Sequence, residues 1–156
     1  MKELEDLRWF PALLRNYQTE FIGAVAAKLH VYDRLIERLR SRPRPVRPMV
    51  DLCSGSGEPA ITIYRGSAGF SSLVLTDKYP ARTRPLGATV TYVPWSVDVL
   101  ELEFNCGTCY TMFNALHHFT DEQKLRIMGR IQAGGSDACF VELLEPTVGC
   151  FFKVLL

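Results

Sequence analysis

The residue types and spacing best suited to chemistry lie in one short segment, residues 50–60, with the sequence VDLCSGSGEPA. Asp51 lies in an apolar run that predicts a strand, and Gly55 and Gly57 follow it, just before a predicted helix that begins at Glu58. Glycines in such a turn let the backbone approach a ligand closely, and the first N–H groups of the helix lack partners within the helix. The pattern predicts a loop that binds a ligand.

Asp51 decides between two kinds of ligand. Gly55-x-Gly57-x-x-Ala60, with Asp77 further along, fits the loose fingerprint of dinucleotide-binding turns, in which the acid holds a ribose hydroxyl. A carboxylate inside a strand is costly unless it meets a cation or several donors, and it would repel a pyrophosphate above the turn. We therefore favour a ligand with an ammonium group. The alternative is that the carboxylate only ties down amides of the loop.

This segment resembles the first motif of the class I S-adenosylmethionine-dependent methyltransferases, an acid followed by glycines at alternate positions. Cys53 stands where the family has its first glycine. Leu73–Lys78 looks like the family's second strand with its terminal acid, so the resemblance implies that Asp77 binds both ribose hydroxyls. The likeness covers the half of the fold that binds the cofactor.

Two later segments continue the resemblance. Ser96–Val99 looks like the loop after the third strand, where an acid, here Asp98, accepts the adenine amino group and Val99 packs on the ring. Thr111–Phe119 looks like the fourth strand and its loop, in the variant common among small-molecule methyltransferases. The cofactor-binding residues that the resemblance implies are Asp51, Cys53, Ser54, Gly55, Gly57, Asp77, Lys78, Asp98, Val99 and Asn114.

Simpler roles remain open for several of these residues. Asp77 could only cap the turn that follows it, and an Asx-turn competes with adenine recognition at Asp98. The two glycines could serve a tight turn alone.

The loop after the fourth predicted strand offers a candidate base. Asn114 is not followed by the two prolines and the aromatic residue of amino-methylating DNA enzymes, which argues against a nucleobase as acceptor. His117, next to His118, could deprotonate a hydroxyl or an amine, because imidazole titrates near neutral pH. The alternative is that one histidine packs and the other caps a helix that begins near Asp121.

The elements that position these residues follow from the hydrophobic pattern. Apolar residues recur at helical spacing over 4–39, ending with Tyr32 and Ile36, and predict a helical lid over residues 1–40. Trp9, Phe10 and Tyr17 on this lid could form the wall of the acceptor site. A Pro/Arg-rich hinge over 41–48 leads to a core over 49–156. Strands are predicted at 49–53, 72–76, 90–93, 109–113 and 138–143. Helices are predicted from Glu58 and over 121–132, the latter with Leu125, Ile127, Met128 and Ile131 on its buried side.

Alternating strands and helices predict an α/β fold with a parallel sheet. The resemblance implies a Rossmann-like doubly wound sheet of order 3-2-1-4-5, with its crevice above the first and fourth strands. The sixth and seventh strands typical of the family are missing, and the apolar run over 148–156 stops without a polar cap. We therefore expect a fragment of a longer chain. The alternative is a tail that packs against an open sheet edge.

Composition excludes several classes of protein. The chain has 156 residues, 47% apolar and 22% charged, with a net charge of +1, so it lacks the basic surface of a nucleic-acid-binding protein. The longest stretch without charged residues, 105–120, contains Asn114 and two histidines and does not predict a membrane span. Five irregularly spaced cysteines indicate reduced thiols in a cytoplasmic protein. The Cys106-x-x-Cys109 pair has no second pair with which to bind zinc, so no metal is expected.

The sequence thus predicts a methyltransferase that uses S-adenosylmethionine, releases S-adenosylhomocysteine and acts on a small molecule. A cofactor-binding regulatory module without catalysis would share the site. An NAD(P)-dependent oxidoreductase would share the fold and Asp77 but would leave Asp51 unexplained and would need a Tyr-x-x-x-Lys pair that the chain lacks. A protein that interacts only through the Pro/Arg hinge is the remaining alternative. The oligomeric state cannot be predicted.

Overall fold

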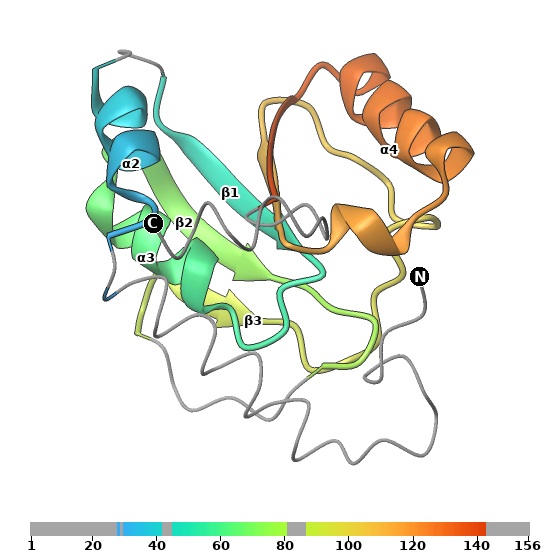
Figure 1. The fold of residues 1–156 in the computed structure, drawn as a ribbon, viewed down its shortest axis with the longest axis horizontal. Coiled ribbons are helices and arrows are strands. Elements are labelled where there is room, and N and C mark those ends of the chain that lie inside the picture. Colours follow the sequence, from blue (N-terminus) through green and yellow to red (C-terminus); the bar gives the residue numbers. More distant parts are fainter. Residues whose placement is uncertain (1–27, 29, 42–44, 81–86, 143–156) are drawn as a thin grey trace, which may run out of the picture.

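A five-stranded parallel sheet forms the centre of the structure (Figure 1), a computed structural model that describes residues 28, 30–41, 45–80 and 87–142. The strand order is β3-β2-β1-β4-β5, and every neighbouring pair is parallel, which confirms the predicted topology. The strands are β1 (Arg47–Leu52), β2 (Phe70–Leu75), β3 (Val90–Tyr92), β4 (Cys109–Phe113) and β5 (Asp137–Val141).

Helices cover both faces of this sheet, as Figure 1 shows. The helices α2 (Asp33–Arg40) and α3 (Glu58–Gly66) lie on one face, where Met49, Leu73 and Leu75 of the strands are buried. The helix α4 (Asp121–Ala133) packs on the other face. Every residue of β4 is buried, as expected for a central strand that is covered on both sides.

The chain leaves β1 toward β2 on one side, whereas β4 pairs with β1 on the other. In open parallel sheets, ligands bind beyond the carboxyl ends of the two strands at such a reversal of strand order. The loops after β1 and β4 therefore mark the place where a site is expected, and Asp51 lies one residue before the end of β1.

Some predicted strand boundaries are wrong by one or two residues. The strand β1 begins at Arg47 inside the predicted hinge, and it ends at Leu52 because Cys53 has a φ of +54° and cannot continue it. The strand β2 begins at Phe70 rather than at residue 72. The strand β5 spans 137–141 rather than 138–143, and β3 ends one residue early, at Tyr92.

The predicted helical stripe through residue 39 is interrupted. His30 has a φ of +56°, and a turn at residues 30–32 precedes α2. Tyr32 is nevertheless buried in the core, and Ile36 packs so closely on α3 that a Cβ at Gly66 would lie 2.7 Å from its Cδ1. The described end of the predicted lid thus packs on the core. Residues 1–27, with Trp9, Phe10 and Tyr17, lie outside the described residues.

Two of the four side chains predicted to be buried on the helix α4 are buried. Ile127 and Ile131 are buried one turn apart, but the predictions for Leu125 and Met128 are wrong, because these side chains are 71% and 38% exposed. Leu125 lies about 200° around the helix axis from Ile127, so it faces solvent. Thr120 and Gln123 form a capping box that begins the helix.

Three features are absent from the part of the chain that the structure describes. None of its helices is long and apolar enough to cross a lipid bilayer. No three of its His, Cys, Asp and Glu side chains gather closely enough to hold a metal ion. No disulfide joins its four cysteines.

Candidate functional site

Asp51 is the most unusual residue at the carboxyl edge of the sheet. Its side chain is 2% exposed, and its Oδ1 accepts a hydrogen bond from Thr111 Oγ1 of β4 at 2.6 Å. Burial raises the pKa of Asp51 to about 7, against the lowering effect of hydrogen bonds from Thr111 and Ser54. Among the described residues no Lys or Arg forms an ion pair with it. A buried acid without a cation partner is suited to a ligand that brings its own positive charge.

The glycine-rich turn after β1 is held in left-handed conformations. Cys53, Gly55 and Gly57 have φ values of +54°, +52° and +80°. A left-handed φ at Cys53 explains why a glycine would be favoured there. Burial, together with the carboxylates of Asp77 and Asp51, raises the pKa of the Cys53 thiol to about 12, so the thiol stays protonated and is a poor nucleophile.

Ser54 connects this turn to the end of β2 through hydrogen bonds. Its N–H donates to Thr76 O at 2.9 Å, and its hydroxyl accepts from Thr76 N at 3.1 Å while it donates to Asp51 O at 3.0 Å. The side chain predicted to bind the cofactor is therefore occupied with shaping the turn.

Gly57 is the N-cap residue of α3 and allows the turn to lie against β2. A Cβ at Gly57 would lie 2.5 Å from Leu75 Cδ1, and the φ of +80° disfavours any side chain. We expect Gly57→Ala to lower the free energy of unfolding by about 2 kcal/mol or more. Urea unfolding followed by circular dichroism measures this change.

Gly129→Ala is the matched control. Gly129 lies inside α4 without a left-handed φ, and a Cβ added there would meet no atom within 4 Å. Alanine there should raise the free energy of unfolding by about 1 kcal/mol through helix propensity. Equal effects of the two substitutions would contradict the steric account of the turn.

Two side chains from neighbouring strands fix the peptide groups of Gly55. Its N–H donates to Asp77 Oδ2 at 2.8 Å, and its carbonyl accepts from the Tyr92 hydroxyl at 2.9 Å. The second oxygen of Asp77 accepts from Tyr79 N at 2.7 Å, which is the simpler, turn-capping role for this residue. Asp77 therefore holds the glycine-rich turn, and ribose binding by its carboxylate stays a prediction.

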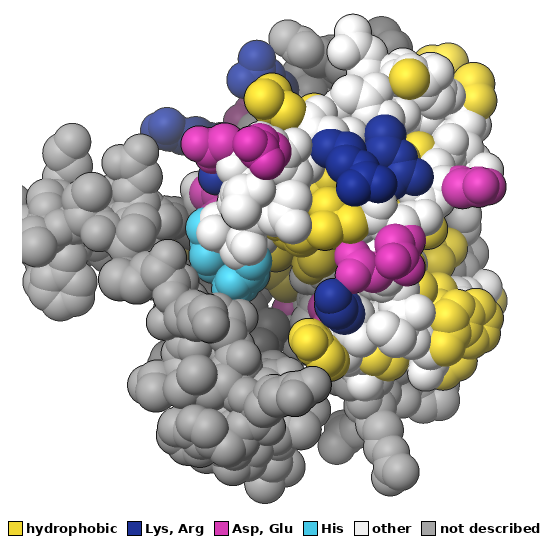
Figure 2. All heavy atoms as spheres, turned by 90° about the vertical axis from the view of Figure 1, so that its right-hand side faces the viewer, with side chains coloured by type: hydrophobic (Ala, Val, Ile, Leu, Met, Phe, Trp, Pro, Cys, Tyr) yellow, Lys and Arg dark blue, Asp and Glu magenta, His cyan; other side chains and the backbone are white. Residues whose placement is uncertain are grey.

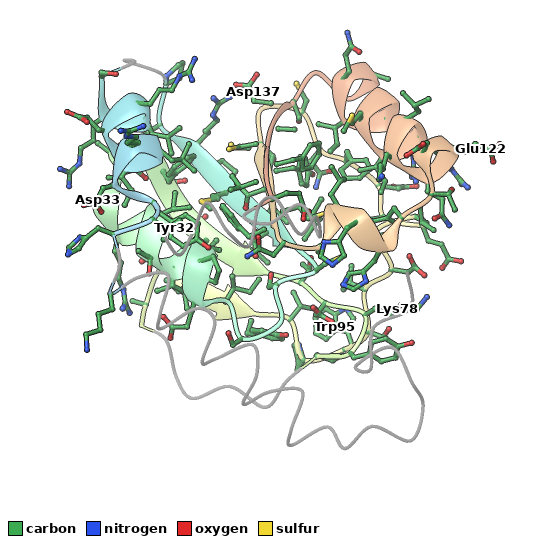
Figure 3. All side chains as sticks on the ribbon, in the orientation of Figure 1. Tyr32, Asp33, Lys78, Trp95, Glu122 and Asp137 are labelled. Atoms are coloured by element: carbon green, nitrogen blue, oxygen red, sulfur yellow. The ribbon has the colours of Figure 1, made fainter. Side chains whose placement is uncertain are left out.

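Lys78 and Asp98, both predicted to bind the cofactor, contact one another. Lys78 Nζ donates to Asp98 Oδ2 at 2.7 Å, and this hydrogen bond raises the pKa of Lys78 and lowers that of Asp98. Asp98 Oδ1 accepts from Leu100 N at 3.0 Å, so the Asx-turn is formed. Val99 is buried in the core beside α4. In Figure 3, Lys78 lies near the exposed Trp95 beside the loops that follow β2 and β3.

Asn114 ends β4 with a φ of +52°, a conformation that asparagine tolerates, and its N–H donates to Val141 O at 2.8 Å. The chain then enters the 3₁₀ turn η2 (Leu116–His118). Asn114 thus lies at the same carboxyl edge as Asp51, and its role toward a cofactor stays a prediction.

His117 forms a dyad with Glu142, directly after β5. His117 Nδ1 lies 2.9 Å from Glu142 Oε2, and Glu142 Oε1 accepts from Leu116 N at 2.6 Å. The His118 ring lies 4.2 Å from the His117 ring, centre to centre. Both histidines are exposed, and histidine side chains reach the surface on the face shown in Figure 2.

Three residues of this site were not predicted from the sequence: Thr111, Tyr92 and Glu142. Glu142 had a usable signal, because it is an acid near the end of the strand predicted over 138–143, and the carboxyl ends of parallel strands share an edge with the loop after β4. Thr111 and Tyr92 had none, because their partners lie 60 and 37 residues away along the chain.

Comparisons with known proteins bear on the fold. No family profile matches the chain, and no curated protein does. Among solved structures, DhpI in complex with SAH matches with a TM-score of 0.60 and 14% identity over 86% of this chain and 68% of that one. The mitomycin 7-O-methyltransferase MmcR matches with a TM-score of 0.50 and 17% identity over 69% of this chain. The likeness is one of fold.

This chain spans 35% of the length of MmcR. A DhpI complex with SAM and HEP also matches, with a TM-score of 0.54 and 13% identity over 92% of this chain and 70% of that one. The chain therefore has the α/β fold of structures that include SAM-dependent methyltransferases.

Proposed function

We propose that this chain binds S-adenosylmethionine and transfers its methyl group to a small-molecule acceptor. The observation that carries the proposal is the buried Asp51 carboxyl, which has no cationic partner among the described residues and lies beside a turn with three left-handed residues. When bound, the cofactor would supply an electrophilic methyl group on its sulfonium sulfur: an acceptor atom would bond to the methyl carbon as the carbon–sulfur bond breaks, with S-adenosylhomocysteine as the leaving group.

The residues present fit such a ligand. Asp51 would hold the ammonium group of the amino-acid end as an ion pair shielded from water. The turn at Cys53–Gly57, fixed by Asp77 and Tyr92, would leave room for the backbone to approach the ligand. Asp77 and Asp98 would face the ribose and the adenine from the ends of β2 and β3.

The His117–Glu142 dyad would serve the acceptor. A carboxylate at Nδ1 orients the imidazole and stabilises the cation that forms when the ring takes up a proton at Nε2. An acceptor hydroxyl or amine that must lose a proton would suit this base. Trp9 and Tyr17 stay candidates for the acceptor wall.

Calorimetric titration of the chain with S-adenosylhomocysteine and with NAD tests the proposal. We expect the first to bind and the second to bind much more weakly, because Asp51 attracts an ammonium and repels a pyrophosphate. Binding of NAD alone would overturn the proposal. Transfer of labelled methyl groups from S-adenosylmethionine to members of a panel of hydroxylated and amino small molecules would show an enzyme. Binding without any transfer would show a binding module.

The proposed ion pair makes binding depend on pH. Below about 7 the Asp51 carboxyl is protonated and loses its attraction for the ammonium. We expect the dissociation constant for S-adenosylhomocysteine to fall about tenfold between pH 6 and pH 8 and then to level off. Asp51→Asn should bind weakly with no such change. A flat profile for the wild-type chain would contradict the assignment.

The same raised pKa has the opposite effect on stability without ligand. The folded chain keeps the Asp51 proton to a higher pH than the unfolded chain, so the free energy of unfolding should fall as the pH rises from about 4 to about 7. Urea unfolding of the wild type and of Asp51→Asn across this range measures the contribution of the carboxyl.

A further inference from the structure

The hydroxyl of Tyr32 is a buried donor without a partner. Tyr32, in the turn before α2, is 3% exposed, and its hydroxyl has no hydrogen-bond partner in the described part of the chain. The ring meets Phe113, at the end of β4, edge-on, with 6.0 Å between ring centres. Buried hydroxyls are nearly always paired, so an unpaired one beside a candidate site points to a missing partner.

Two groups of the candidate site surround this hydroxyl. Burial raises the pKa of Tyr32, the nearby Asn114 side chain lowers it in part, and the Asp51 carboxyl raises it further. The Asn114 side chain is near enough to lower the pKa as a hydrogen-bonding neighbour does, although the hydroxyl has no partner that meets hydrogen-bond geometry in the described part of the chain. Tyr32 therefore remains a neutral O–H donor that lies close to Asp51.

The fold places the side chains of Tyr32 and Asp51 on the same side of the sheet. Tyr32 packs with Met49 of β1 and with residues of α3, and Figure 3 shows it on the side covered by α2 and α3. Side chains alternate along a strand, so Asp51, two residues after Met49, points to that side as well. A ligand group that reaches Asp51 would meet the Tyr32 hydroxyl.

We infer that the Tyr32 hydroxyl donates a hydrogen bond to the carboxylate of a ligand whose ammonium group is held by Asp51. The site would then recognise the free α-amino acid end of its ligand. This inference rests on the proposed function. A ligand carboxylate placed near Asp51 is repelled by it and needs a donor, and a neutral O–H meets that need without pairing with Asp51 itself.

Tyr32→Phe tests the inference, with two ligands as probes. S-adenosylhomocysteine carries both the ammonium and the carboxylate, whereas its decarboxylated analogue, an adenosyl thiopropylamine, keeps only the ammonium. We expect the variant to bind S-adenosylhomocysteine about tenfold more weakly than the wild type does. We expect the variant and the wild type to bind the decarboxylated analogue with the same affinity. The melting temperature without ligand should stay the same or rise, because the variant removes an unpaired buried hydroxyl.

Tyr64→Phe is the matched control. Tyr64, on α3, is half-buried, and its hydroxyl donates to Ser71 O at 3.5 Å near the start of β2, whereas Asp51 lies at the carboxyl edge of the sheet. This control variant should leave both affinities unchanged. Equal weakening of both ligands by Tyr32→Phe, or no weakening of either, would overturn the inference while the proposed function stands. A wild-type chain that binds neither ligand would overturn both.

If Tyr32→Phe does not fold, the wild-type chain gives the answer. The ¹³Cζ resonance of Tyr32 should shift on addition of S-adenosylhomocysteine and stay in place with the decarboxylated analogue. Equal shifts with both ligands would overturn the inference.

Discussion

Asp51→Asn is expected to weaken the binding of S-adenosylhomocysteine about a hundredfold or more. Removing one partner of a buried charge pair costs about 3–5 kcal/mol, and every 1.4 kcal/mol corresponds to about a factor of ten in affinity. Asparagine has nearly the same shape, and its side-chain oxygen can still accept the hydrogen bond from Thr111 Oγ1. Calorimetric titration at pH 8 measures the loss.

Stability without ligand should change in the opposite direction. Ionising a buried carboxyl whose pKa is raised from 3.8 to about 7 costs the folded protein about 4 kcal/mol at most, and the asparagine variant avoids this cost. We therefore expect Asp51→Asn to be at least as stable as the wild type at pH 8. A variant that loses affinity because it unfolds would contradict this account.

Asp137→Asn is the matched control for Asp51→Asn. Asp137 begins β5 and pairs with Arg47 at the start of β1, at the opposite edge of the sheet. The control makes the same change, aspartate to asparagine, and removes an ion pair, but it leaves the carboxyl edge of the sheet unchanged. The affinity for S-adenosylhomocysteine should stay within about twofold of the wild-type value.

His117→Gln is expected to lower the rate of methyl transfer about a hundredfold or more while the affinity for S-adenosylhomocysteine stays the same. General base catalysis contributes about 10²–10⁴-fold, and glutamine cannot take up the proton of the acceptor. The measurement is transfer of labelled methyl groups to whichever hydroxylated or amino compound of the panel the wild type methylates best.

Two neighbours of His117 sharpen this test. Glu142→Gln keeps an oxygen near Nδ1 but loses the charge that stabilises the imidazolium. It should therefore lower the rate of methyl transfer about tenfold. His118→Gln should have little effect. Loss of activity in His118→Gln with a normal rate in His117→Gln would show that the base has been misassigned.

The sequence predicted the sheet and its reversal point because these depend on local signals. Apolar runs bounded by glycines and prolines mark parallel strands, and the acid before the glycine-rich turn is visible in one stretch of eleven residues, 50–60. The alternation of strands and helices predicts parallel strands, and the order β3-β2-β1-β4-β5 was predicted from the resemblance to a doubly wound fold. The position of Asp51 at the carboxyl edge was therefore predictable.

The contacts that give each residue its role were not predictable, because they join distant parts of the chain. Thr111 meets Asp51 across 60 residues, and Glu142 meets His117 across 25. The turn contacts of Asp77 and Asp98 are local and were among the predicted alternatives: both accept backbone N–H groups of their own turns, and ligand binding by either carboxylate stays a prediction. The wrong prediction for Leu125 has a different cause: Leu125 lies about 200° around the helix axis from Ile127, so the two side chains cannot share one buried face.

The ¹³C resonance of the Asp51 carboxyl, followed from pH 4 to pH 9 with and without S-adenosylhomocysteine, tests most directly whether this group binds an ammonium. Without ligand the carboxyl should titrate near pH 7. With saturating ligand its pKa should fall by at least about one to two pH units, because a nearby positive charge favours the ionised form. A carboxyl that titrates at the same pH with the ligand bound would contradict the assignment.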